Sequence, residues 1–156
     1  MRGRQTMNYG DQQKWIDWYE KKTGDKFIVP EGYVINHHER RGLMTLKADT
    51  EGSMLIVGYV VGDGRFWHDA VEVIAKTNNY RCIATICTRN VEAYIRFWRY
   101  KIVKEWNKNG EKRFLCKNRG GCYATLTYRG KDSNTGVDTY NVIQYMVPGD
   151  KPKLEE

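Results

Sequence analysis

The chain has 156 residues, of which 40% are hydrophobic and 29% charged, and it carries a formal net charge of +7. This composition excludes disordered and fibrous proteins, and the lack of an apolar run of roughly 18–20 residues or of an apolar leader argues against a membrane or secreted protein. We therefore expect a single cytoplasmic domain over residues 1–156, with loose tails at 1–10 and 148–156, no membrane partner and reduced, structural cysteines.

The first half of the chain predicts one helix followed by three strands. Aromatic and aliphatic residues at helical spacing predict a helix over Asp11–Lys22, with Asp11 as its N-cap. The β-branched and aromatic runs Tyr33–His38 and Gly42–Ala48 predict a hairpin. Met54–Val61 is the most apolar run in the chain and predicts a buried central strand.

The second half alternates strands and helices. After the turn at residues 62–64, an apolar pattern predicts a helix that ends at about Asn78. Cys82–Cys87 predicts a second buried strand and Val91–Tyr100 a helix, while a strand begins in Ile102–Trp106 and Gly121–Tyr128 is expected to be the last long strand. This order predicts an α/β fold with a mixed sheet flanked by helices.

Two stretches at these element boundaries resemble motifs of the GNAT acyltransferase superfamily. Tyr59-Val60-Val61-Gly62-Asp63-Gly64 is similar to the family's acyl-CoA pyrophosphate loop, [Arg or Gln]-x-x-Gly-x-[Gly or Ala], with Tyr59 at the Arg or Gln position. Asn90 to Ala93, with Phe97 seven residues after the asparagine, resembles the family's Asn-x-x-Ala-x-x-x-Tyr helix. The resemblance covers roughly residues 33–128 in element order.

This resemblance implies a single GNAT-like domain with a mixed, mostly antiparallel central sheet. It also implies an acyl-CoA-dependent N-acyltransferase, with acetyl-CoA as the expected donor, in which an amine attacks the thioester directly. In the family the strand before the glycines splays from the strand after the helix, which here means that Ile56–Tyr59 parts from Ala84–Cys87. The pantetheine arm then pairs with the free backbone, and a backbone N–H there stabilises the oxyanion.

The glycine turn has a physical rationale of its own as an anion site. A strand that stops in a glycine turn and restarts as a helix exposes backbone N–H groups and the positive end of a helix dipole, which suit phosphate. Asp63 opposes such binding unless its carboxylate points away, and a plain tight turn is the alternative reading. The residues expected to bind the cofactor, largely through backbone groups, are Val60, Val61, Gly62, Asp63, Gly64, Arg65, Phe66 and Asn90.

Acid and base groups are expected on the hairpin and on the helix after the second buried strand. An amine acceptor must lose a proton, and the candidates for its base are His37, His38 and Glu39, of which Glu39 or His38 is favoured, with His68 and Asp69 as lesser choices. Phe97 stands where the family often places a tyrosine that protonates the departing thiolate. Tyr94 and Tyr100, about one helical turn to either side, are the candidates to replace it, and a binding protein without chemistry is the alternative.

The basic second half favours a competing class, a nucleic-acid-binding module. Arg81 to Lys131 holds 13 lysine and arginine residues against 3 acidic ones, interleaved with aromatic residues. The two readings combine in the DNA-modifying Mom family of phage GNAT-like proteins, which acts on adenine. The acceptor is therefore open between a protein, a small molecule and a nucleic-acid base. The sequence predicts no metal site.

Overall fold

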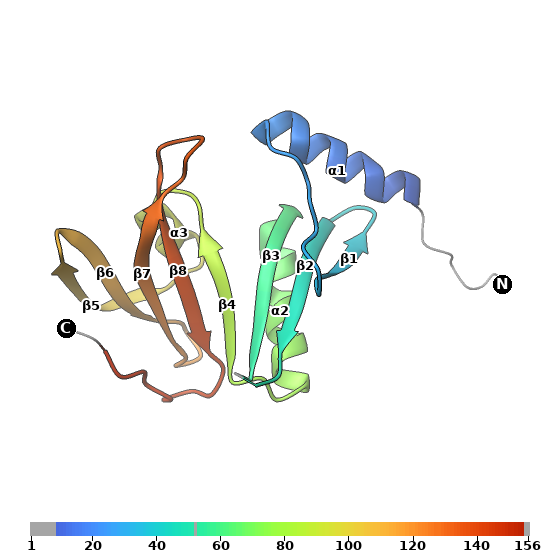
Figure 1. Ribbon diagram of the computed structural model, residues 1–156. Coiled ribbons are helices and arrows are strands. Elements are labelled where there is room, and N and C mark those ends of the chain that lie inside the picture. Colours follow the sequence, from blue (N-terminus) through green and yellow to red (C-terminus); the bar gives the residue numbers. More distant parts are fainter. Residues whose placement is uncertain (1–8, 52, 155–156) are drawn as a thin grey trace.

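The computed structural model describes residues 9–51 and 53–154, which form one sheet and the helices that flank it (Figure 1). The helices are α1 (Tyr9–Thr23), α2 (Gly64–Thr77) and α3 (Val91–Phe97). The strands are β1 (Val34–His38), β2 (Gly42–Asp49), β3 (Met54–Gly62), β4 (Cys82–Cys87), β5 (Lys101–Lys108), β6 (Glu111–Lys117), β7 (Tyr123–Lys131) and β8 (Asp138–Tyr145).

The sheet has 8 strands in the order β1-β2-β3-β4-β8-β7-β6-β5. Neighbouring strands pair antiparallel everywhere except β3 and β4, which run parallel and are joined by α2. A parallel pair needs such a crossover, whereas antiparallel neighbours are joined by short turns. The expected α/β class with a mixed, mostly antiparallel sheet is confirmed.

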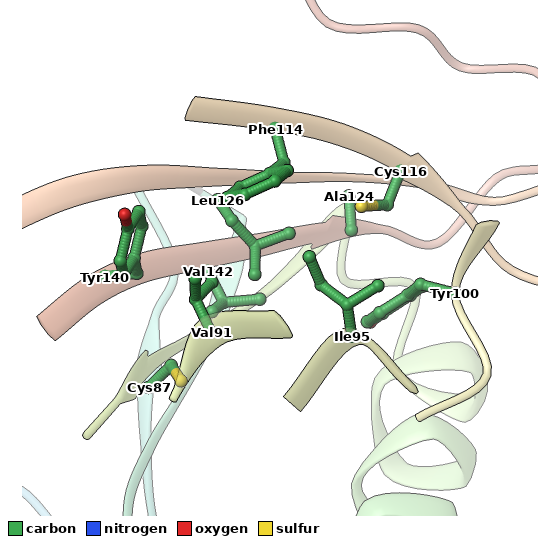
Figure 2. Close-up of a cluster of buried hydrophobic side chains, with 10 residues drawn as sticks. All are labelled: Cys87, Val91, Ile95, Tyr100, Phe114, Cys116, Ala124, Leu126, Tyr140 and Val142. Carbon is green, nitrogen blue, oxygen red and sulfur yellow. The ribbon is translucent and has the colours of Figure 1, made fainter. Parts of the chain in front are cut away.

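Helices α2 and α3 cover one face of the sheet, and α1 lies on the other. Under α2, Leu55, Val57 and Ile83 pack with Trp67 and Val71 in one buried cluster. Figure 2 shows the second cluster, in which side chains of β6, β7 and β8 point toward α3; it comprises Cys87, Val91, Ile95, Tyr100, Phe114, Cys116, Ala124, Leu126, Tyr140 and Val142. Ile83 and Cys87 lie on the same side of β4, so both clusters occupy one face.

Two strands were missed by the sequence reasoning, and one of them is central. Gly121–Tyr128 was expected to be the last long strand, but β8 follows it and inserts between β4 and β7. β6 was also missed, because its first three residues are charged, and the strand expected to begin in Ile102–Trp106 runs from Lys101 to Lys108 as β5. The predicted helix over Val91–Tyr100 ends at Phe97, and Arg99 follows it with φ of 57°.

The expected loose tails are partly ordered. Helix α1 already includes residues 9 and 10, while residues 1–8 and 155–156 lie outside the described part of the chain. Residues 148–154 form no helix or strand, but the Gly149 N–H donates to the Gly121 carbonyl, and Asp150 pairs with Arg81 at 3.2 Å. These contacts hold the C-terminal segment against the end of β7.

The four cysteines are free and buried, as expected of structural thiols. Burial raises the pKa of the Cys116 thiol to about 12. The unfolded chain loses this proton near pH 9.0 and the folded protein does not, so the folded state holds one more proton between these two values. This contribution to stability is complete below pH 9 and decreases by about 1.4 kcal/mol per pH unit above it.

We therefore expect Cys116→Ala to flatten the alkaline decrease in stability. The measurement is the urea unfolding free energy of both proteins, kept reduced, at several values from pH 8 to pH 11. The two curves should differ by a constant amount below pH 9 and converge above it. Parallel curves throughout would contradict the assignment.

Candidate functional site

The parallel strands β3 and β4 pair only at their beginnings. Their register runs from Met54↔Cys82 to Ile56↔Ala84, and both strands then continue without pairing to each other, β3 as far as Gly62. Figure 1 shows the two arrows separating toward their heads. The sheet is therefore open between two of its central strands.

A β-bulge in β3 accompanies this opening. Leu46 pairs with Val57 and Met44 with Val60, so Gly58 and Tyr59 together lie opposite the single residue Thr45. The Tyr59 N–H donates to Thr45 Oγ1 at 2.7 Å, which satisfies the donor displaced from the ladder. A bulge bends its strand and increases the local twist, which carries β3 away from β4.

Gly58 is the residue that this bulge requires. A β-carbon at this position would lie 2.5 Å from Thr45 Oγ1, closer than β-carbons are found in proteins, and would make a tight contact of 3.1 Å with the Tyr33 ring. On the β4 side, Thr85 Oγ1 donates to the Val57 carbonyl at 3.4 Å. Beyond that contact, the β3 backbone has no strand partner on this side and is available to an extended ligand.

A cavity of about 540 Å³ lies at this opening, and its lining residues come from both faces of the sheet. On the face covered by helices it is lined by His68 of α2 and by Tyr94 and Trp98 of the α3 region. On the opposite face its mouth is lined by Tyr19 of α1, and by Arg129 and Asp132 of the β7–β8 hairpin. The volume is that of an ordinary small-molecule site.

The residues expected to bind a cofactor divide into two groups. Val60, Gly62 and Gly64 line the cavity, so the glycine turn opens directly into it. Val61, Asp63, Arg65, Phe66 and Asn90 do not line it. Val61 is 1% exposed and packed on the other side of β3, and Asn90 caps α3 by accepting the Ala93 N–H at 2.9 Å.

Asp63 is the N-cap of α2, and Arg41 neutralises it. Its carboxylate accepts the Phe66 N–H at 3.1 Å and pairs with Arg41 at 2.5 Å. The Phe66 hydrogen bond first, and then Arg41, hold the pKa of Asp63 below its usual value. The carboxylate is thereby paired with a residue of the β1–β2 turn, which reduces its repulsion of a phosphate bound at the glycine turn.

Two further arginines lie around the α2 end of the cavity. Arg65, in the first turn of α2, has its guanidinium 4.6 Å from the centre of the Phe97 ring and donates to the Phe97 carbonyl at 3.3 Å. Arg89, in the loop after β4, lines the cavity. Sequence reasoning missed Arg89, although its place directly after the second buried strand put it at the same edge of the sheet as the glycine turn.

A buried chain of hydrogen bonds lies beside the cavity. The Tyr100 hydroxyl donates to Gln144 Oε1 at 2.5 Å, and Gln144 Nε2 donates to Glu72 at 2.6 Å. Glu72 lies 3.7 Å from His68 Nδ1, and the His68 ring stacks on Trp98 with ring centres 4.1 Å apart. Sequence reasoning missed Gln144 and Glu72, which come from β8 and α2 and meet only in the fold.

Both candidate acids, Tyr94 and Tyr100, line the cavity. Burial is the main cause that raises the pKa of each hydroxyl, so both stay protonated across the neutral range. Tyr100 already donates its proton to Gln144, whereas Tyr94 packs its ring edge-on against Trp98.

The candidate bases of the hairpin lie outside the cavity. His38 ends β1, its Nδ1 accepts the Arg40 N–H at 3.1 Å, and its ring packs against Phe66. The Glu39 backbone carbonyl accepts Trp15 Nε1–H at 3.0 Å, beside a separate hollow near α1. The pairing His38↔Gly42 places this tip beyond the sheet, so the structure does not bring His38 or Glu39 together with Tyr94 and Tyr100.

One group of side chains in the described part of the chain has metal-ligand spacing. Oxygen and nitrogen atoms of His68, Asp69 and Glu72 lie within 4.8 Å of one another. Glu72 already accepts a hydrogen bond from Gln144, and Asp69 is exposed. As an alternative to binding a metal, the two carboxylates can hold the His68 imidazole in place and polarise it.

Comparison of the chain with protein-family models, with characterised proteins and with solved structures gives no match. In residues 9–51 and 53–154, no helix has the length and apolar character needed to cross a bilayer.

Proposed function

We propose that the protein is a GNAT-like N-acyltransferase that transfers an acyl group, most simply acetyl, from acyl-CoA to an amine. The observation that carries the proposal is the cavity between the separating strands β3 and β4, which opens at the glycine turn before α2. Because the residues that line this cavity come from both faces of the sheet, the donor and the acceptor are proposed to enter from different sides.

The donor enters from the α2 end. Its pyrophosphate lies at the backbone of Gly62 and Gly64, at the N-terminal end of α2, where the helix dipole favours anions. Arg65 and Arg89 supply positive charge beside it. The extended pantetheine arm lies between β3 and β4 and pairs with the backbone that the bulge leaves free.

Transfer needs one group to take a proton and one to give it. The amine nitrogen attacks the thioester carbonyl, the C–S bond breaks, and the products are an N-acyl amine and the CoA thiol. His68 is the imidazole that lines the cavity, and we assign it as the base in place of His38 and Glu39. Tyr94 gives its proton to the departing thiolate, because the Tyr100 proton is held by Gln144.

Thiol release tests this function. The protein is mixed with acetyl-CoA and a panel of amines that includes polyamines, lysine peptides and aminoglycosides, and free CoA is followed with a thiol reagent. We expect release that depends on one class of amine and that decreases roughly 10²- to 10⁴-fold in His68→Gln. His38→Gln, which changes an imidazole outside the cavity, is the control and should keep the full rate. Bound acetyl-CoA with no amine-dependent release would show a binding protein and contradict the transferase.

A substitution of Asp63 should strengthen acetyl-CoA binding, whereas most substitutions in the site should weaken it. Asp63→Asn keeps an oxygen that accepts the Phe66 N–H but removes the negative charge and releases Arg41. If pyrophosphate binds at this turn, acetyl-CoA affinity should rise by roughly fivefold, the size of one unit-charge interaction across water at close range. Isothermal titration calorimetry measures the change. Weaker binding would mean that the phosphates lie elsewhere.

A further inference from the structure

Among residues 9–51 and 53–154, no helix packs on the face of strands β4 to β8 that lies opposite α3. Helix α1 contacts β2 and β3, and both α2 and α3 pack on the other side of the sheet. In Figure 1 this uncovered surface is turned toward the viewer, with α3 behind the strands. We call it the open face.

The strand registers give the side chains of the open face in rows. At the end of β6, the start of β7 and the end of β8, Lys117, Tyr123 and Tyr145 lie side by side. The next row carries Lys104, Leu115, Thr125 and Ile143, and the row after it carries Trp106, Arg113, Thr127 and Asn141. At the upper end lies Arg129, which lines the cavity mouth.

Each aromatic ring of the open face is accompanied by a cation. Lys104 Nζ lies 5.7 Å from the Trp106 ring centre, and Lys117 Nζ lies 5.1 Å from that of Tyr123. The Arg81 guanidinium lies 5.4 Å from the ring centre of Tyr145. Tyr123 and Tyr145 are partly exposed, and they are direct neighbours across β7 and β8.

Basic side chains predominate on this face. The cations are Arg81, Lys101, Lys104, Lys108, Arg113, Lys117, Arg129 and Lys151. The acidic side chains are Glu111, 4.0 Å from Arg113, Asp150, which pairs with Arg81, and Asp132, which lies with Arg129 at the cavity mouth. The acids Glu92 and Glu105 lie on the opposite side, where both pair with Lys112. Positive charge is therefore concentrated on the face that lacks a helix.

We propose that the open face binds single-stranded nucleic acid. Lysine and arginine side chains spread over several strands track a phosphate backbone, and partly exposed aromatic rings stack unpaired bases. A base pair in a duplex keeps its flat surface covered, so the rings at Tyr123, Tyr145 and Trp106 favour a single strand over a duplex. Because the row of β7 and β8 leads to Arg129, a bound strand extends toward the cavity mouth.

Binding is tested with a fluorescein-labelled oligothymidylate of about 12 nucleotides, followed by anisotropy across a range of salt concentrations without acetyl-CoA. We expect binding whose affinity falls steeply with salt, and weaker binding to a duplex of the same length. Tyr145→Leu keeps an apolar side chain but loses the ring, and should weaken binding roughly fivefold to a hundredfold without changing the salt slope.

Lys117 and Lys112 form a matched pair for the charge contribution. Both are on β6, Lys112 exposed and Lys117 partly exposed, and their side chains point to opposite faces of the sheet. Lys117→Ala should reduce the salt slope by about 0.7, the value of one phosphate contact to a single strand, while Lys112→Ala with the same net charge should leave it unchanged. Equal effects of the two variants, tighter binding to the duplex, or preferential binding of polyglutamate would each overturn the proposal. Since no acyl donor is present, the result is independent of the proposed transferase activity.

Discussion

Gly64→Glu should abolish acetyl-CoA binding while leaving the fold intact. The new carboxylate would stand at the helix N-terminus where the proposed pyrophosphate lies. Two unit charges about 4 Å apart repel by about 4 kcal/mol near a protein surface, so we expect at least about a 100-fold loss of affinity in a calorimetric titration.

The fold should tolerate this change. A β-carbon at Gly64 would make only ordinary contacts, 3.8 Å from Trp98 and 3.9 Å from Phe97, and an acidic residue in the first turn favours the helix. Val73→Glu is the matched control, because Val73 is on the same helix and 64% exposed. A folded Gly64→Glu protein that binds acetyl-CoA as the wild type does would contradict the assigned loop.

Tyr100 and Gln144 should be strongly coupled in stability. The Tyr100 hydroxyl is buried and donates to Gln144, which is 3% exposed and in turn donates to Glu72. Gln144→Leu leaves that hydroxyl without an acceptor and Glu72 without its donor. A buried polar group without a partner costs about 1–3 kcal/mol, so the unfolding midpoint should decrease by roughly 5–10 °C.

A double-mutant cycle separates this effect from simple loss of packing. Tyr100→Phe alone leaves the Gln144 oxygen without its donor, whereas Tyr100→Phe combined with Gln144→Leu removes both partners. The double variant should therefore be less destabilised than the sum of the single variants, by about 1 kcal/mol or more. Additive losses measured by urea unfolding would show that the hydrogen bond contributes nothing of its own.

The local pattern of the sequence was sufficient to predict the bounds of β3 and β4, the two strands between which the cavity lies. The apolar runs that predicted β3 and β4 differ by at most one residue from the observed strands, and the turn between β3 and α2 was placed correctly. These elements are short-range, and their signals are an apolar run, a glycine turn and a capping residue. The bulge also had a signal, since an isolated glycine within a strand marks such a site.

The buried polar chain depended on contacts that a local pattern does not contain. Gln144 and Glu72 are 72 residues apart, and they meet because β8, which was not predicted, pairs with β4 in the middle of the sheet. The run Asp138–Tyr145 alternates polar and apolar residues only from Thr139 to Val142, and its position beside β4 follows only from the completed sheet.

The base that we propose differs from the candidates favoured by the sequence for a geometric reason. A histidine pair at a hairpin tip is conspicuous in the sequence, but His38 packs against Phe66 at the start of α2 and does not line the cavity between β3 and β4. His68 was less conspicuous because it stands alone on a helix. Its stacking on Trp98 requires α2 and α3 to be neighbours, which the sheet determines.

The unfolding midpoint of the wild-type protein with and without excess acetyl-CoA tests the central claim most directly. A ligand that binds only the folded state, present at 100 times its dissociation constant, adds about 2.7 kcal/mol, which is roughly 5–10 °C for a domain of this size. We predict a shift of this size with acetyl-CoA and with CoA, and none with pantetheine, which lacks the pyrophosphate. An unchanged midpoint at millimolar acetyl-CoA would contradict the assignment of the cavity between β3 and β4 to an acyl-CoA donor.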